Sequence, residues 1–263
     1  IIKFSSPYDE RSQGEEIANI IEKSIYDVSK NAVLYRTNME ARSLIDTFTR
    51  RRIPFVLLDK GYNFFEHFIS KDILAYLQLA INIKDRESFL HIINKPFRYV
   101  SKSNLEYLRT YREDKSPFDI LIEKKDTPPY QAKKLDELRK DIIHLNKLSL
   151  SYAIQYIITE LGYIDYLKDY SERYNQSIDD LEDIVEEFKS AADGLKTIIE
   201  LLSHVEKVKE SIEESKDIKE GVILSTIHGV KGMEFKNVFL INANEELKNK
   251  DKQIKTLSEN NKA

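Results

Sequence analysis

The stretch that decides the fold lies near the end of the sequence and reads Val222-Ile-Leu-Ser-Thr226-Ile-His228-Gly-Val-Lys231-Gly232-Met-Glu234-Phe-Lys-Asn-Val-Phe-Leu-Ile241. Its two ends, residues 222–226 and 237–241, are rich in Val, Ile, Leu and Phe, which predicts two buried strands. Gly229 and Gly232 stand between them and permit a sharp turn with exposed backbone amides. A strand that ends at Thr226 delivers this turn to the rim of a sheet, where α/β proteins bind their ligands.

The N-terminal part of the sequence has the same alternating pattern. Apolar runs typical of buried strands are separated by segments with helical spacing, and Pro54 ends the second helix. This alternation predicts a parallel, doubly wound sheet. The segments are the apolar run 1–4, a helix over 15–25 with isoleucines 17, 20, 21 and 25 on one face, a strand at 32–35, a helix through 44–48 and a strand at 55–58.

The middle of the sequence changes to helical spacing throughout. Residues 181–208 form one long apolar stripe, which Gly194 can divide into two helices. No segment of this block has a convincing strand pattern. We therefore expect an α/β fold in which residues 1–68 and 218–263 form one parallel-sheet lobe, interrupted by an all-helical insertion over residues 69–217. Domains tolerate such insertions where the flanking chain ends lie close together.

Composition excludes several classes of protein. The 263 residues include no Cys, which excludes disulfides, thiol catalysis and zinc fingers and suits a reducing compartment, so we expect a cytoplasmic protein. No apolar run is long enough for a membrane span, and no secretory signal is present. The sequence begins without Met, so we expect it to belong to a longer polypeptide.

Charge is distributed unevenly. The whole sequence has 41 basic and 45 acidic side chains, a net charge of −4. Residues 70–217 have 23 basic and 29 acidic side chains, a net charge of −6, whereas residues 218–263 have 8 and 6, a net charge of +2. The protein therefore lacks the overall positive charge of many nucleic-acid binders, and any polyanion must be held by local groups.

Two segments resemble motifs of the UvrD/Rep/PcrA-type superfamily 1 DNA helicases. Residues 226–235 are similar to that family's motif V, T-x-H-x-x-K-G-L-E-F, with Met233 in place of Leu. Residues 32–42 resemble its A-V-L-Y-R-x-N-x-x-S-R segment, with Ala41 in place of Ser. Further similar segments follow in order at 53–55, 61–66, 71–77 and 92–98. The resemblance covers about residues 15–245 and implies an incomplete RecA-like lobe, called 2A, interrupted by the helical 2B insertion.

The resemblance implies part of an ATP-dependent DNA helicase that acts in DNA repair. The 2A lobe of such an enzyme grips single-stranded DNA and couples ATP hydrolysis to translocation and unwinding, with ATP and Mg²⁺ as cofactors. The implied partners are single-stranded DNA, duplex DNA and the 1A and 1B lobes of the same polypeptide. The sequence contains no G-x-x-x-x-G-K-[ST] loop, and we expect the arginine-bearing motif VI beyond its end. Phosphoryl transfer needs these parts together, so we expect this chain alone not to hydrolyse ATP.

The resemblance also assigns roles to individual residues. It implies DNA contacts at Arg36, Asn38, Arg42, Thr226, His228 and Lys231, and nucleotide contacts at Gly232 and Glu234. It assigns no catalytic residue and no metal ligand to this chain. Structural alternatives remain open: a helix cap by Asn38, a surface ion pair by Arg36, an ordinary structural role for His228 and a surface carboxylate for Glu234.

Three further groups have competing interpretations. The run Arg50–Arg52 ends a predicted helix, where cations are favoured by the helix dipole, so we interpret it as a solvated face. Tyr62, Phe64 and Phe65 can stack on bases, but core packing is the simpler interpretation. In the segment 98–101 the family has R-G-I-G, whereas this sequence has Tyr99 and Ser101 in place of both glycines, which leaves duplex binding by this turn open.

A second function, from another class, also fits part of the sequence. The chain can be a non-catalytic, degenerate helicase lobe whose acidic insertion binds a protein partner. The net charge of −6 over residues 70–217 and the two replaced glycines favour this alternative. The nearly complete motif V favours the helicase.

Overall fold

The computed structural model describes residues 3, 5–58 and 63–242. The chain divides into two compact units, one formed by residues 1–64 with 207–263 and the other by residues 65–206. The second boundary lies inside helix α11 (Ile198–Ser215), because Ser211 and Glu214 near the end of this helix lie beside Phe48 and Phe55 of the first unit. The apolar run 1–4, apart from Lys3, and the segment from residue 243 onward lie outside the described residues.

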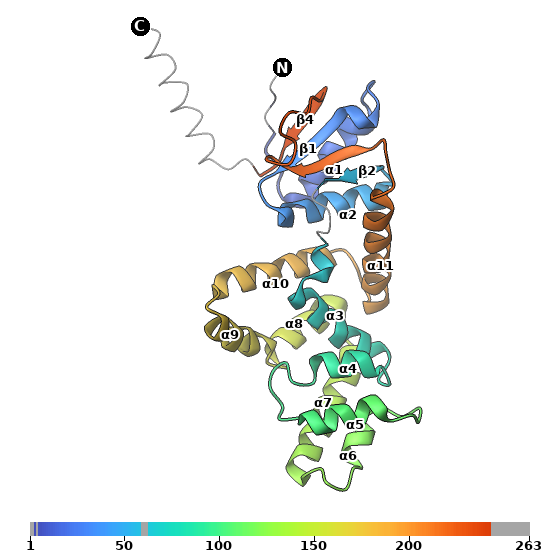
Figure 1. Ribbon diagram of the computed structural model, residues 1–263, viewed down its shortest axis with the longest axis vertical. Coiled ribbons are helices and arrows are strands. Elements are labelled where there is room, and N and C mark those ends of the chain that lie inside the picture. Colours follow the sequence, from blue (N-terminus) through green and yellow to red (C-terminus); the bar gives the residue numbers. More distant parts are fainter. Residues whose placement is uncertain (1–2, 4, 59–62, 243–263) are drawn as a thin grey trace. The chain divides into compact units, whose positions relative to one another are not determined.

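The first unit contains a four-stranded parallel sheet in the order β2-β3-β1-β4. Strands from opposite ends of the described chain meet in it, since β1 and β2 (blue) lie with β3 and β4 (orange) in Figure 1. The predicted α/β class with a parallel sheet is confirmed. Its elements are β1 (Asn31–Tyr35), β2 (Phe55–Leu57), β3 (Val222–Thr226), β4 (Asn237–Leu240), α1 (Glu10–Glu22), α2 (Ala41–Arg51) and the short 3-10 helices Val28–Lys30 and Asn38–Glu40.

Helices α1 and α2 pack closely in this unit. A Cβ added at Gly14 of α1 would lie 2.9 Å from a side-chain hydroxyl of α2, so glycine allows the close approach. Ile17 and Ile21 are buried, as their spacing predicts. Ile20 is 46% exposed, and Ile25 lies beyond the end of the helix and is 91% exposed. The expected four-isoleucine face is therefore wrong in two ways: α1 buries a narrower stripe than predicted, and it ends at Glu22 and not at residue 25.

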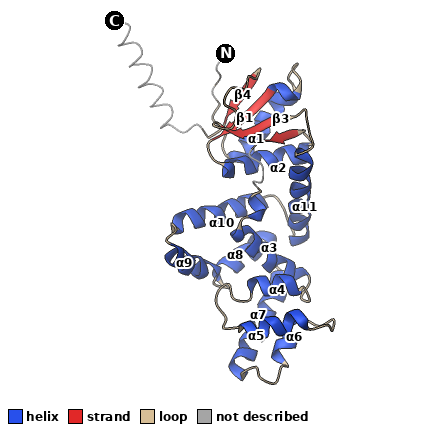
Figure 2. Ribbon diagram, in the orientation of Figure 1, coloured by secondary structure: helices blue, strands red, loops and turns tan. Residues whose placement is uncertain are grey.

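The second unit consists of helices, as Figure 2 shows, and the expectation of a helical block without strands is confirmed for residues 65–206. Gly194 lies between α10 and α11 with a φ of +79°, so it separates the two helices as predicted. None of the helices in the described ranges is both long and apolar enough to cross a membrane. The helices are α3 (Phe68–Ile81), α4 (Arg86–Ile92), α5 (Lys102–Thr110), α6 (Pro117–Ile122), α7 (Pro129–Leu145), α8 (Leu150–Thr159), α9 (Tyr163–Tyr174), α10 (Ile178–Ala192) and the first part of α11.

A fully buried carboxylate joins three parts of the helical unit. Asp72 of α3 has no exposed surface. It accepts a hydrogen bond from the Tyr163 hydroxyl of α9 at 2.8 Å, and its other oxygen lies 2.6 Å from Lys95 Nζ and 2.6 Å from His91 Nε2. Burial and the adjacent Asp72 carboxylate raise the pKa of Tyr163 far above its usual value, so the phenol keeps its proton and donates it. We call Asp72, His91, Lys95 and Tyr163 the Asp72 cluster.

Candidate nucleic-acid interface

The carboxyl ends of β1 and β3 lie side by side. Tyr35 pairs with Thr226 in the parallel register, and the N–H of Ile227 donates to the carbonyl of Tyr35 at 3.0 Å. Arg36 directly follows Tyr35, and His228 follows Thr226 by two positions; both side chains are exposed. The two segments singled out in the sequence, which are almost two hundred positions apart, therefore meet at one edge of the sheet.

The loop after β1 is shaped by Glu40. Its Oε2 accepts the backbone N–H of Arg36 at 2.8 Å, and its own N–H donates to the carbonyl of Thr37 at 3.1 Å. These bonds fold residues 38–40 into a 3-10 turn and leave the side chain of Arg36 in solvent. Asn38 is half-buried, and its Oδ1 has no hydrogen-bond partner among the residues that the structure describes. Sequence reasoning missed Glu40, because no pattern reveals a side chain that returns to its own loop.

The segment from β3 to β4 crosses from one edge of the sheet to the other. It leaves the carboxyl end of β3 with a turn in which Gly229 N–H donates to the carbonyl of Thr226, and it ends at Asn237, which pairs with Asn31 at the start of β1. Glu234 precedes Asn237 by three residues, which keeps it within roughly 11 Å of the start of β4. This segment therefore begins at the carboxyl edge of the sheet and ends at the amino edge, with Glu234 on its second half.

The turn in this crossing segment is open to solvent. Lys231, Gly232 and Glu234 are all exposed. Gly232 has a φ of +86°, which L side chains rarely adopt, and nothing lies within 4 Å of the position where its Cβ would be. Glycine is thus required here by the backbone conformation and not by crowding. The exposed backbone leaves room for a ligand to approach closely.

Arg42 does not belong to this exposed group. Only 5% of its side chain is exposed, and its Nη1 lies 2.7 Å from Asp46 Oδ2, one helical turn further along α2. Its guanidinium also lies over the ring of Phe64, 5.8 Å from the centroid. The charge of Arg42 is therefore compensated inside the protein, and a DNA contact at Arg42 is not part of the function that we propose.

The other charged and aromatic candidates have structural roles. The run 50–52 is predicted to be a solvated face, but Arg50 and Arg51 also form ion pairs with Glu15 and Glu22. These ion pairs connect α2 to α1. Phe64 is 3% exposed and belongs to the core of the first unit. Phe65 is 1% exposed and packs within the second unit against Phe188 and His204, and Tyr62 lies outside the described residues. In residues 5–58 and 63–242, no group of His, Asp or Glu side chains is placed to hold a metal ion.

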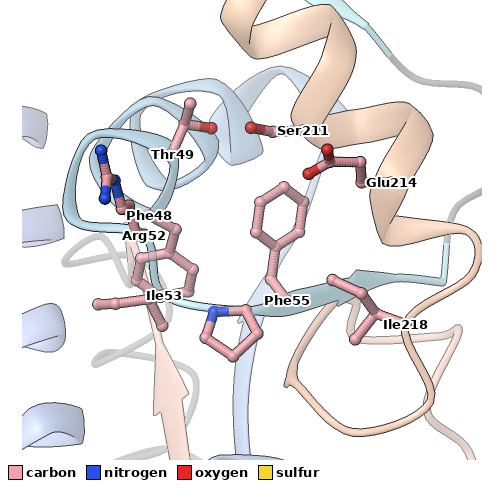
Figure 3. Close-up of a pocket in the computed structure, with 9 residues that line it drawn as sticks. Phe48, Thr49, Arg52, Ile53, Phe55, Ser211, Glu214 and Ile218 are labelled. Atoms are coloured by element: carbon pink, nitrogen blue, oxygen red, sulfur yellow. The ribbon is translucent and has the colours of Figure 1, made fainter.

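A pocket of about 410 Å³ lies at the edge formed by the amino ends of the strands, beside the start of β2 (Figure 3). Figure 3 shows the hydroxyl of Thr49 directed toward that of Ser211, with Glu214 on α11 and the ring of Phe55 below them. Arg52, in the left-handed conformation that ends α2, lies at the other side. None of the predicted DNA or nucleotide residues lines this pocket, so it is separate from the strand-end site.

Comparisons with known proteins agree with the motifs. The family described as the UvrD-like helicase C-terminal domain matches residues 1–262. The ATP-dependent DNA helicase PcrA of Staphylococcus epidermidis is 29% identical over 267 residues, which cover 94% of this chain and 36% of that protein. The ATP-dependent DNA helicase Rep of Buchnera aphidicola is 28% identical over 268 residues, or 93% of this chain and 40% of that protein. DNA helicase II of Rickettsia typhi is 26% identical over 249 residues, or 91% and 38%. The chain thus spans less than half the length of these relatives.

Proposed function

Because this chain belongs to the UvrD-like helicase C-terminal domain family, we propose that it is part of an ATP-dependent DNA helicase. In this proposal the first unit is the 2A lobe, which grips single-stranded DNA, and the second unit is the 2B insertion. The whole polypeptide couples ATP hydrolysis to translocation and duplex unwinding in DNA repair, in the cytoplasm. Its partners are DNA and the 1A and 1B lobes of the same polypeptide.

One observation supports the DNA contact most strongly. Arg36 and His228 are exposed at the ends of two neighbouring strands, inside the two segments that resemble the helicase motifs. A guanidinium binds a phosphate through two parallel hydrogen bonds, and the backbone amides of the adjacent turns add further donors. Thr226 and Asn38 supply polar groups at the same strand ends, and Lys231 adds an exposed cation three residues after His228. This edge therefore offers the local cations that an overall acidic protein needs to hold a polyanion.

The nucleotide contacts are a separate part of the proposal. Gly232 and Glu234 are exposed on the crossing segment, where an open backbone and a carboxylate suit the ribose side of a nucleotide. ATP with Mg²⁺ would supply the free energy for movement in the whole polypeptide. The chain itself has no phosphate-binding loop in its sequence. These residues would hold one side of the nucleotide and leave phosphoryl transfer to groups of the 1A lobe.

The purified chain is accordingly expected to show no ATP hydrolysis, with or without DNA. The reason is that phosphoryl transfer requires a phosphate cradle, the metal and arginine contacts acting together. Phosphate release should be followed with and without single-stranded DNA. DNA-stimulated turnover that a magnesium chelator abolishes would contradict this part of the proposal.

The DNA site is tested by replacing Arg36 or His228 with alanine in the whole polypeptide. Each change should weaken single-stranded DNA binding by about 1–3 kcal/mol, as for other charge-assisted hydrogen bonds. Arg36→Ala should also lower the salt dependence of binding by about one ion. Fluorescence anisotropy of a labelled oligonucleotide at several salt concentrations measures both quantities.

Two further variants serve as controls for these measurements. Arg52→Ala removes an exposed arginine at the opposite edge of the sheet and should leave DNA affinity unchanged. Glu234→Ala should weaken nucleotide binding more than DNA binding. If Arg36→Ala and His228→Ala keep the affinity and salt slope of the unchanged protein, these residues serve the fold and the site assignment is wrong.

Glu40 permits a finer test of the loop geometry. Glu40→Ala and Glu40→Gln both remove a negative charge near the proposed phosphate contact, but only Gln keeps an acceptor for the Arg36 N–H. The alanine variant should therefore bind DNA more weakly than the glutamine variant by about 0.5–1.5 kcal/mol, the net value of one hydrogen bond. The same anisotropy titration measures this difference, and equal affinities would show that the hydrogen bond does not position Arg36.

A further inference from the structure

A turn in the helical unit exposes two neighbouring aromatic rings. Phe97 and Tyr99 are each 64% exposed. Their ring centroids lie 4.6 Å apart, and the ring planes are tilted by 58°. Large aromatic side chains are usually buried, so a pair held together in solvent is informative. We call these two residues the aromatic pair.

The backbone of the turn is held in one conformation by side chains on both sides of it. Asn94 Oδ1 accepts the N–H groups of Arg98 and Val100 at 3.2 Å each, and Asn94 Nδ2 donates to the carbonyl of Val100 at 2.8 Å. From α7, Gln131 Nε2 donates to the carbonyl of Tyr99 at 2.8 Å. The aromatic pair therefore stands on a fixed support, which lowers the conformational entropy that a ligand must overcome.

Tyr99 occupies an unfavourable backbone conformation. Its φ is +59°, in the left-handed region that residues with a Cβ rarely adopt. A glycine at this position would adopt the conformation without strain. A large aromatic residue where glycine suits the backbone better indicates that the ring itself has a use, since such strain accumulates at functional sites.

The surroundings of the turn favour an anionic chain. Ser101 caps the N-terminus of α5, and Gln131 lies in the first turn of α7, so the positive ends of two helix dipoles are close to the aromatic pair. Lys102 begins α5 and Lys134 lies in the second turn of α7; both are exposed, and neither forms an ion pair with any residue that the structure describes. These cations suit an anionic ligand better than the apolar surface of a protein partner.

We propose that Phe97 and Tyr99 form a stacking platform for unpaired bases of single-stranded DNA. This inference rests on the proposed function for the nature of the polymer but not on the strand-end contacts of the first unit. Aromatic rings stack on any base, and nearby cations meet the phosphates. The ring of Tyr99 also stands where a glycine would let duplex phosphates approach the backbone, so the platform suits unpaired bases and not duplex backbone.

The test compares an ordinary single-stranded oligonucleotide with an abasic one of the same length, which keeps the phosphates and lacks the bases. The test variant combines Phe97→Leu with Tyr99→Gly, and glycine suits the φ of +59° so that the turn keeps its shape. Binding of the ordinary oligonucleotide by the whole polypeptide should weaken about tenfold or more, as for loss of base stacking. Binding of the abasic oligonucleotide should not change.

Control variants separate stacking from other effects. Tyr99→Phe keeps the ring and should bind the ordinary oligonucleotide with the affinity of the unchanged protein. Tyr152→Leu removes a tyrosine that is 71% exposed elsewhere on the unit and should have no effect on binding. Equal weakening on both oligonucleotides, or no weakening on either, would overturn the proposal. If the aromatic-pair variant binds normally while Arg36→Ala still weakens DNA binding, the platform is wrong and the proposed function stands. If only Arg36→Ala leaves DNA binding unchanged, the strand-end contact is wrong and the platform stands.

Discussion

Replacement of Asp72 with alanine is expected to destabilise the helical unit by about 3–5 kcal/mol, the usual cost of breaking a buried ion pair by removing one partner. The carboxylate has no exposed surface and binds Lys95, His91 and the hydroxyl of Tyr163. Its removal leaves the fully buried Tyr163 hydroxyl without an acceptor and the Lys95 cation without its counter-charge. Urea unfolding followed by circular dichroism measures the loss.

Two further variants serve as comparisons for the loss of stability expected of Asp72→Ala. Asp165→Ala removes an acidic residue that is 73% exposed and pairs with Lys168 at 3.4 Å, so its cost should stay within about 1 kcal/mol. Tyr163→Phe removes only the phenolic hydroxyl and leaves Asp72 with Lys95 and His91 as partners, so an intermediate cost of about 1–3 kcal/mol is expected. An Asp72→Ala variant as stable as Asp165→Ala would show that the cluster does not stabilise the fold.

Arg98→Ala is the second substitution with a large expected effect. The guanidinium of Arg98 donates to backbone carbonyls at the end of α4, in its own turn and after α8, and to a tyrosine hydroxyl of α3. Alanine removes all of these hydrogen bonds from a partly buried site, which we expect to cost about 3 kcal/mol or more, because each hydrogen bond to a charged group contributes about 1.5–3 kcal/mol and the bonds are not additive. The acceptors are the carbonyls of Ile92, Ile93, Pro96 and Leu161 and the hydroxyl of Tyr76, at 3.0–3.3 Å.

The conservative variant sharpens this prediction. Arg98→Lys keeps the charge but not the planar fork of donors, so it should recover only a minor part of the lost stability. Arg109→Ala, at an exposed residue paired with Glu106, is the matched control and should change the unfolding free energy by less than about 1 kcal/mol. Thermal and urea unfolding of the three variants measure the differences. Full recovery by lysine would mean that charge alone, and not the fork geometry, holds the turn.

Several features of the fold could be predicted because they depend on local sequence. The strands at 32–35 and 222–226 are apolar runs whose residues are mostly buried, and Gly194 interrupts an apolar helical stripe. The parallel pairing followed from the alternation of strands and helices. Ile20 was misplaced because helical spacing marks which residues share a face, but the width of the buried stripe depends on the neighbouring helix. Ile25 was misplaced because the helix ends at Glu22, before it.

The candidate site was only partly predictable, for a related reason. Arg36 and His228 follow strand ends, and a parallel sheet brings such ends to one edge, so their proximity could be expected. Arg42, like Arg36, is an arginine in the segment 32–42 that resembles a helicase motif. Its burial depends on Asp46 and Phe64, which surround it only after folding. The position of Glu234 depends on where the segment after β3 crosses the sheet, and motif spacing contains no information about that path.

The sequence by itself determined the order of strands and helices, the helical insertion and the family motifs, because hydrophobic periodicity and turn residues act over a few neighbouring positions. Only the tertiary structure decided what the polar side chains do. Tyr163 reaches Asp72 across 91 positions, and Arg98 reaches the carbonyl of Leu161 across 63. Buried polar groups must find partners wherever the packed backbone supplies them, and that supply exists only once distant helices have come together.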